Sequence, residues 1–123
     1  MENPRYLNLT PHKVNVFMLE IPPSGCIARL ESNQKLIMST PIPVYKTEYS
    51  SITVNGKPFS EFIEKTSGER YTVYIVSTIT LIALKIQGFP LQTENYIIVS
   101  PNTARAIRDE NGNIIGVDSF QTL

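Results

Sequence analysis

A small set of residues in this chain has the side-chain chemistry needed to hold a phosphorylated nucleotide. Arg29 and Arg108 are candidates for phosphate binding, because the forked guanidinium group matches the geometry of phosphate oxygens. A flat aromatic ring can stack on a base, and amide or hydroxyl groups can hydrogen-bond a base or a ribose. The candidates for these roles, together with the acid that follows Arg108, are Phe17, Phe89, Asn102, Thr103 and Asp109.

Several of these candidates also have an ordinary structural interpretation, which the sequence leaves open. Arg108 can pair with the adjacent Asp109 at the edge of a hairpin, an exposed interaction worth about 0–1 kcal/mol. Arg29 can be a solvated strand residue, and Asn102 can cap the turn at Pro101. Residue type alone therefore nominates binding residues but does not bring them together in one site.

The chain contains few residues that are suited to catalysis or to metal binding. His12 and Cys26 are the only residues of their types, and one of each cannot make a usual structural zinc site. No serine lies in a nucleophile-elbow motif, and the glycine patterns of Walker and Rossmann loops are absent. The sequence predicts no metal, no cofactor and no catalytic residue. A hydrolase that uses His12 as a general base with a nearby acid stays open as an alternative.

Size and charge narrow the class of protein further. The 123 residues, 41% of them hydrophobic, are enough for one domain, 1–123, with a real core. Eleven basic residues balance eleven acidic ones, which disfavours DNA or RNA as a partner. The lone cysteine and the absence of an N-terminal apolar segment suit a reducing cytoplasm. The longest apolar run, 79–86, is too short to span a bilayer, so no membrane is expected.

The elements that must position the candidate residues are mostly strands. Alternation predicts a strand over 13–19, in which Phe17 shares a face with polar neighbours. A turn at 22–25 precedes a strand over 26–30, which carries Arg29. Prolines 41 and 43 interrupt two further predicted strands, 35–38 and 42–47, and favour a bend or a sheet edge there. The Asn-Gly pairs at 55–56 and 111–112 predict hairpin turns, the second of them between 106–108 and 114–117.

One main helix is expected over about 78–87. Ser77 can cap its start and Gly88 can end it, directly after a strongly β-prone segment at 71–76. A shorter helix is expected over 59–65. The main helix is apolar nearly all round, more than one small sheet can cover, so we expect a subunit interface; a strand over 78–87 is the alternative. The predicted class is α+β: a β-rich antiparallel sheet core with one main helix, in an oligomer.

Several motifs, in their order and spacing over about the whole chain, give it a resemblance to a known family. They are Asn-Leu-Thr-Pro-His at 8–12, Pro-Ser-Gly at 23–25 followed by Ala28 and Arg29, Tyr-Ile-Val-Ser at 74–77, and Ser-Pro-Asn-Thr at 100–103 with the segment 106–117. In these segments the chain resembles the phage anti-Thoeris sponge family. Members of that family bind cyclic ADP-ribose signals of the bacterial Thoeris defence without cleaving them.

The resemblance implies an assembly and a ligand site. It implies a β-rich protomer that forms homodimers and then hexamers in the cytoplasm of a host bacterium. Pockets for cyclic ADP-ribose isomers (gcADPR) lie at the dimer interfaces, and some members also hold cyclic di- or trinucleotides of CBASS defence between protomers. By this resemblance Phe17 occupies the region of a base-stacking aromatic, and Asn102 and Arg108 fall in the C-terminal pocket segment. Arg29 suits the oligonucleotide pocket.

The chain also departs from the family pattern. Segment 91–96 is not the Arg-Asp-Asp-like segment that the family implies after the helix, and Asp118 stands where a basic residue is expected. Both departures leave the ligand contacts and the preferred isomer open. A structural phage protein, such as a tail or capsid accessory subunit, is a third class that the β-rich composition and the apolar helix fit equally well.

Overall fold

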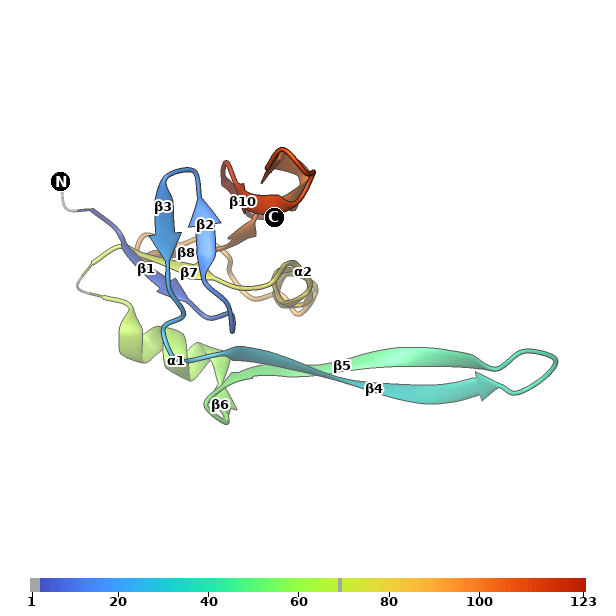
Figure 1. Cartoon of the computed structure of the whole chain (residues 1–123). Helices are drawn as coiled ribbons and strands as arrows, with labels where there is room; N and C mark the ends of the chain where they lie inside the picture. Colours follow the sequence, from blue (N-terminus) through green and yellow to red (C-terminus); the bar gives the residue numbers. More distant parts are fainter. Residues whose placement is uncertain (1–2, 69) are drawn as a thin grey trace.

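The computed structural model describes residues 3–68 and 70–123 and has a mixed α+β fold (Figure 1). This confirms the predicted class. The elements are, in chain order, β1 (Arg5–Asn8), β2 (Val14–Val16), β3 (Leu19–Ile21), β4 (Ala28–Met38), β5 (Val44–Val54), β6 (Lys57–Pro58), α1 (Phe59–Thr66), β7 (Thr72–Ile75), α2 (Thr78–Ile86), β8 (Tyr96–Pro101), the short 3-10 helix η1 (Thr103–Arg105), β9 (Ala106–Arg108), β10 (Ile114–Val117) and β11 (Phe120–Gln121).

The core surrounds a four-stranded sheet in the order β1-β7-β8-β11. Every residue of β7 is buried, because both faces of the sheet are covered. On one face Tyr74 packs in a cluster with residues of α1, α2 and the base of β5, and on the other Ile75 packs against β2 and β3. The predicted antiparallel sheets are present elsewhere, but β1, β7 and β8 pair in parallel. A continuous apolar run such as 73–76 is typical of a parallel strand buried on both faces.

Helix α2 begins and ends where its capping residues predict. The Ser77 hydroxyl accepts a hydrogen bond from the Thr80 backbone N–H, at 3.3 Å, and Gly88 follows the helix at φ +79°. Its buried residues, among them Leu81 and Leu84, face the core, whereas Ile82 stays 43% exposed. The alternative of a strand over 78–87 is therefore wrong. The shorter helix expected over 59–65 is confirmed as α1.

Replacing Ser77 with alanine is expected to lower the free energy of unfolding by about 1 kcal/mol, because the Thr80 N–H loses its acceptor. Urea unfolding followed by circular dichroism measures the change. Ser60→Ala, at an exposed position inside α1, is the control and should leave stability unchanged or slightly higher, since alanine is the better helix former. An equal loss in both variants would contradict the capping role.

The strand predicted over 13–19 is in fact a tight β-hairpin. Strand β2 ends at Val16, Phe17 and Met18 form the turn, and β3 runs back so that Val14 lies opposite Ile21. Phe17 adopts φ +56°, an uncommon conformation for a bulky residue, and donates its backbone N–H to the Val117 carbonyl at 2.8 Å. The apolar sequence at this turn hid it, since no glycine or asparagine marks the site.

The longest elements, β4 and β5, form an antiparallel hairpin that projects well beyond the rest of the molecule (Figure 1). We call this hairpin the arm. Each strand has 11 residues, or about 35 Å at 3.3 Å per residue. Both predicted strands around Pro41 and Pro43 belong to it, and the prolines lie in its terminal loop. The predicted Asn-Gly turn at 55–56 is confirmed after β5, with both residues at positive φ.

Candidate functional site

A hollow of about 390 Å³ lies between the base of the arm and the first turn of α2. Its volume falls in the range of small-molecule pockets, roughly 300–1,000 Å³. We call it the arm–helix pocket. The residues that line it are Ala28, Arg29, Leu30, Glu31, Ser32, Tyr49, Ser77, Ile79 and Thr80.

Two features of the fold hold the walls of this pocket in place. The base of β4 is anchored because Ala28 and Leu30 pack against the main core cluster. Further out the register shifts between Leu30 and Ser32, so that the arm leaves the core at this point. At the far end of α2, the Gln87 side-chain amide donates to the Ser50 carbonyl at 3.0 Å, which ties the helix to the arm.

The pocket combines the chemical groups that a nucleotide needs. Arg29 supplies a guanidinium for phosphate. The N-terminus of α2 also lines the pocket, and the partial positive charge of a helix N-terminus favours phosphate. Tyr49, 50% exposed, offers an aromatic face, and Ser32 offers a hydroxyl. Glu31 is the acid on the wall; it would repel phosphate and can accept hydrogen bonds from ribose hydroxyls.

Five of the predicted residues lie on or beside the sheet β3-β2-β10-β9, which we call the C-terminal sheet. Phe17 donates its backbone N–H to Val117 at one end of this sheet, and its side chain is 74% exposed. Asn102 lies between β8 and η1, and its side-chain amide donates to the Ser119 hydroxyl at 3.2 Å. Thr103 begins η1 and is exposed. Phe17 and Asn102 thus each bond to the segment 117–119, at the end of β10.

Arg108 and Asp109 both take part in the predicted hairpin turn between β9 and β10. Arg108 donates to the Gly112 carbonyl at 2.8 Å, and the Asp109 carboxylate accepts from the backbone N–H groups of Asn111 and Asn113, each at 2.9 Å. These contacts stabilise the turn. They replace the Arg108–Asp109 pair that the sequence offered as the structural alternative.

Phe89 lies apart from the other predicted residues. It is half-buried, packs against the main core cluster and contacts the Phe59 ring edge-on, with centroids 5.3 Å apart. A base that stacked on Phe89 would have to share the ring with this contact. The seven predicted residues therefore lie in three places: Arg29 in the arm–helix pocket, Phe89 beside the core, and the others on or beside the C-terminal sheet.

Sequence reasoning missed one arginine at the C-terminal sheet. The Nε of Arg105 donates to both oxygens of Asp118, at 2.9 and 2.8 Å. The hydrogen bond from Arg105 holds the pKa of the Asp118 carboxyl below its usual range, and the same bond raises the pKa of Arg105. The acid that stands where a basic residue was expected is thus matched by a cation thirteen residues earlier. No sequence signal links the two positions.

Motif 8–12 has a structural role that its residue types did not reveal. Asn8 is 1% exposed; its amide donates to the carbonyls of His12 and Ile21, at 2.8 and 3.1 Å, and its Oδ1 accepts from the Thr10 N–H and hydroxyl. Ser24, of the Pro-Ser-Gly motif, donates its N–H and its hydroxyl to the Asn8 carbonyl. Hydrogen bonds thus join two motifs that are separate in sequence. The His12 side chain is exposed.

No family model, curated protein or solved structure matches this chain. Within the described residues, no group of three or more histidines, cysteines or acids could hold a metal ion. None of the described helices is long and apolar enough to cross a membrane.

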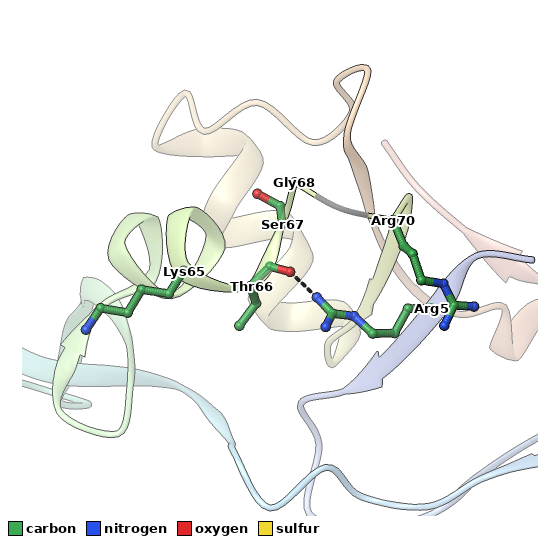
Figure 2. A pocket seen from close by; sticks show the side chains of 6 residues that line it. All are labelled: Arg5, Lys65, Thr66, Ser67, Gly68 and Arg70. Atoms are coloured by element: carbon green, nitrogen blue, oxygen red, sulfur yellow. Dashed lines mark hydrogen bonds between the residues drawn. The ribbon is translucent and has the colours of Figure 1, made fainter. Parts of the chain in front are cut away.

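Another hollow, of about 390 Å³, lies where α1 ends, and it is lined by Arg5, Lys65, Thr66, Ser67, Gly68 and Arg70. Figure 2 shows the Arg5 guanidinium bonded to the Thr66 carbonyl and the Lys65 side chain pointing away from it. The Lys65 ammonium lies 3.1 Å from the Glu61 carboxylate, and Arg5 also reaches the Thr72 hydroxyl at 3.4 Å. Because Arg5 ties β1 to α1 and Lys65 is paired, these two side chains are already engaged, and we prefer the arm–helix pocket as the ligand site.

Proposed function

We propose that this protein is a non-catalytic sponge that sequesters cyclic ADP-ribose-type signals. The observation that supports the proposal is the arm–helix pocket, whose lining combines Arg29, Tyr49, hydroxyl groups and the N-terminus of α2. The sponge acts by mass action in the host bacterial cytoplasm, since bound signal cannot reach its effector. The proposal includes homodimers that assemble into hexamers, and cyclic di- or trinucleotides as a second class of ligand.

The groups of the pocket match the parts of a cyclic ADP-ribose isomer. The diphosphate would bind Arg29 and the first two N–H groups of α2, at Thr78 and Ile79. The adenine would stack on Tyr49, and the riboses would bond Ser32 and Glu31. Ile79 adds an apolar contact at the pocket's edge. This distribution needs no net positive charge, in keeping with the formal net charge of zero.

Affinity also favours a pocket closed by a second protomer. Nanomolar binding needs roughly −12 kcal/mol. One stacked base contributes about 1–3 kcal/mol, and one charge-assisted hydrogen bond about 1.5–3 kcal/mol, before the cost of association is met. An open pocket on a single protomer supplies too few such contacts. A partner protomer that encloses the ligand from the other side would supply the remainder.

The experiment that tests this function is isothermal titration of the protein with the two linkage isomers of gcADPR. The protein–ligand mixture is then heated, and the released compound is identified by chromatography. We expect tight binding of at least one isomer and release of the ligand intact. Recovery of a cleaved product would favour the hydrolase alternative, in which case His12→Ala should abolish turnover.

A structural phage accessory subunit is the second candidate, and the projecting arm is the observation that favours it. The arm projects from the body (Figure 1) and its residues 31–51 are exposed, which leaves them accessible to a neighbouring subunit. Absence of heat with both isomers, in protein shown to be folded, would put this candidate first. The two candidates therefore give opposite results in the same titration.

A further inference from the structure

We propose that one face of the arm is an interface that the same face of a second copy of this chain covers. The register of β4 and β5 defines the two faces between Ser32 and Tyr49. Cross-strand partners on the first face, which we call the uncharged face, are Ser32 with Tyr49, Gln34 with Thr47, and Leu36 with Tyr45. Partners on the opposite, charged face are Asn33 with Glu48 and Lys35 with Lys46.

The distribution of charge along the arm is the first observation. Residues 32–49 contain three charged side chains, Lys35, Lys46 and Glu48, and all three lie on the charged face. A hairpin with water on both sides has no physical reason to sort its charges in this way. Alternation of charged and uncharged positions is typical of a strand with one face buried against another surface.

The uncharged face also continues a surface that the domain already buries. The next cross-strand pairs toward the body are Leu30 with Ile52 and Ala28 with Val54, and they pack in the main core cluster. Beyond them Leu36, Tyr45 and Tyr49 are 49%, 53% and 50% exposed. A two-stranded ribbon is marginally stable in water unless a face of it is covered. The outer part of this face therefore lacks the cover that the inner part has.

The exposed area of the chain indicates how large the missing cover is. The protomer exposes 8339 Å². A compact monomer of 13.8 kDa exposes about 6,600 Å² by the usual scaling of surface with mass. The excess, about 1,700 Å² per copy, is spread over both faces of the arm, so one face amounts to about 850 Å² per copy and about 1,700 Å² between two copies, the size of a standard specific interface.

A second copy fits this face better than a partner of different chemistry. In a two-fold symmetric dimer each patch meets itself, so a patch with a net charge would repel its own copy. The uncharged face carries Tyr45, Tyr49 and Leu36, together with short polar side chains, and no charge. It is therefore self-complementary, whereas the charged face, with Lys35 opposite Lys46, is not.

This interface would also close the arm–helix pocket. Tyr49 belongs to the uncharged face and lines the pocket together with Ile79, so a copy seated on Tyr49 would cover the pocket mouth. This last step rests on the proposed function, whereas the interface itself does not. Assembly is therefore measured without ligand, so that its failure is distinct from a failure of nucleotide binding.

The test compares two variants at adjacent positions of β5. Thr47→Glu adds a negative charge to the uncharged face, and Lys46→Gln changes the net charge by the same amount on the charged face. Both side chains are exposed in the protomer, so both variants are expected to fold, as circular dichroism would verify. Mass by light scattering and sedimentation should show an oligomer for the wild type and for Lys46→Gln. Thr47→Glu should run as a 13.8 kDa protomer or dissociate at least tenfold more readily.

Disulfide trapping provides a second measurement. A residue forms a disulfide with its own copy only beside the two-fold axis, so single cysteines are placed in turn at 34, 45 and 47 of the uncharged face in a Cys26→Ser background. At least one of them should form an intermolecular disulfide under mild oxidation, and Lys46→Cys should not. A wild type that stays a protomer at all concentrations would overturn the proposal and leave this face to a different protein. An oligomer whose mass is unchanged by Thr47→Glu would also overturn it, because the interface would then lie elsewhere.

Discussion

Replacing Asn8 with alanine is expected to lower the free energy of unfolding by about 3 kcal/mol, which corresponds to a fall in melting temperature of roughly 10 °C. The amide of Asn8 is buried and makes four hydrogen bonds, to Thr10, His12 and Ile21. Urea and thermal unfolding measure the loss. This is the largest single polar effect that the structure predicts.

The size of the effect follows from what the substitution leaves without a partner. Each buried polar group deprived of its partner costs about 1–3 kcal/mol, whereas a group that water can reach costs less. The Ile21 carbonyl is held by a buried hydrogen bond, while His12 lies at the surface. The expected value is the sum of a full penalty for the Ile21 carbonyl, smaller penalties for the His12 and Thr10 groups that lose Asn8, and the cost of a small cavity. Ser24 donates to the backbone carbonyl of Asn8, which alanine keeps, so the loss should stay within the loop that leads from Asn8 to Ile21.

Two variants separate this network from a general cost of losing an asparagine. Asn15→Ala removes an exposed amide with one hydrogen bond, of 3.3 Å to Ile115, and should cost about 1 kcal/mol or less. Asn8→Asp keeps the acceptor for Thr10 but loses both donors and buries a charge, so it should be at least as destabilising as Asn8→Ala. If Asn8→Ala lowered the free energy of unfolding by no more than Asn15→Ala does, the hydrogen bonds of Asn8 would not stabilise the fold as proposed.

Local signals in the sequence predicted the elements that carry their own capping or turn chemistry. Ser77 and Gly88 located α2 within one residue, because capping depends on neighbours in the chain. The Asn-Gly pair at 55–56 and the segment 109–113 gave their turns for the same reason. In each case the deciding hydrogen bonds or dihedral angles lie within a few residues of the signal.

Elements that depend on distant pairing were predicted less well. Phe17 was read as part of a strand, since its turn is set by pairing of β2 with β10, about a hundred residues later. The arm was read as separate strands, because a continuous hairpin requires the register of 28–38 with 44–54. That register also sorts Lys35, Lys46 and Glu48 onto one face, a pattern invisible until the strands are aligned.

The candidate site shows the same division between local and distant information. Arg29 was predicted from its residue type, but Tyr49 was missed, because only the arm's pairing brings 49 beside 32 and toward α2. Asn8 was quoted for its motif, and its role became clear only from contacts with residues up to sixteen positions away. Residue type was thus enough to predict Arg29 as a phosphate-binding residue, whereas its neighbours in the pocket follow from the topology.

Replacing Arg29 with alanine is expected to raise the dissociation constant for gcADPR about 10- to 100-fold. The reason is that a charge-assisted hydrogen bond to phosphate contributes about 1.5–3 kcal/mol, and each 1.4 kcal/mol is a factor of ten. Arg29→Lys should recover part of the loss, since lysine keeps the charge but not the fork. Isothermal titration measures both, and urea unfolding should be unchanged because the side chain is exposed.

Arg108→Ala is the matched variant, because it also removes one exposed guanidinium and the sequence predicted the same role for it. We expect a smaller loss of affinity, since Arg108 already donates to Gly112 within its hairpin whereas Arg29 lines the pocket. A loss confined to Arg108→Ala would move the site to the hairpin of β9 and β10. Equal losses would indicate a composite site to which both arginines contribute, since they lie on different sheets and in different surroundings.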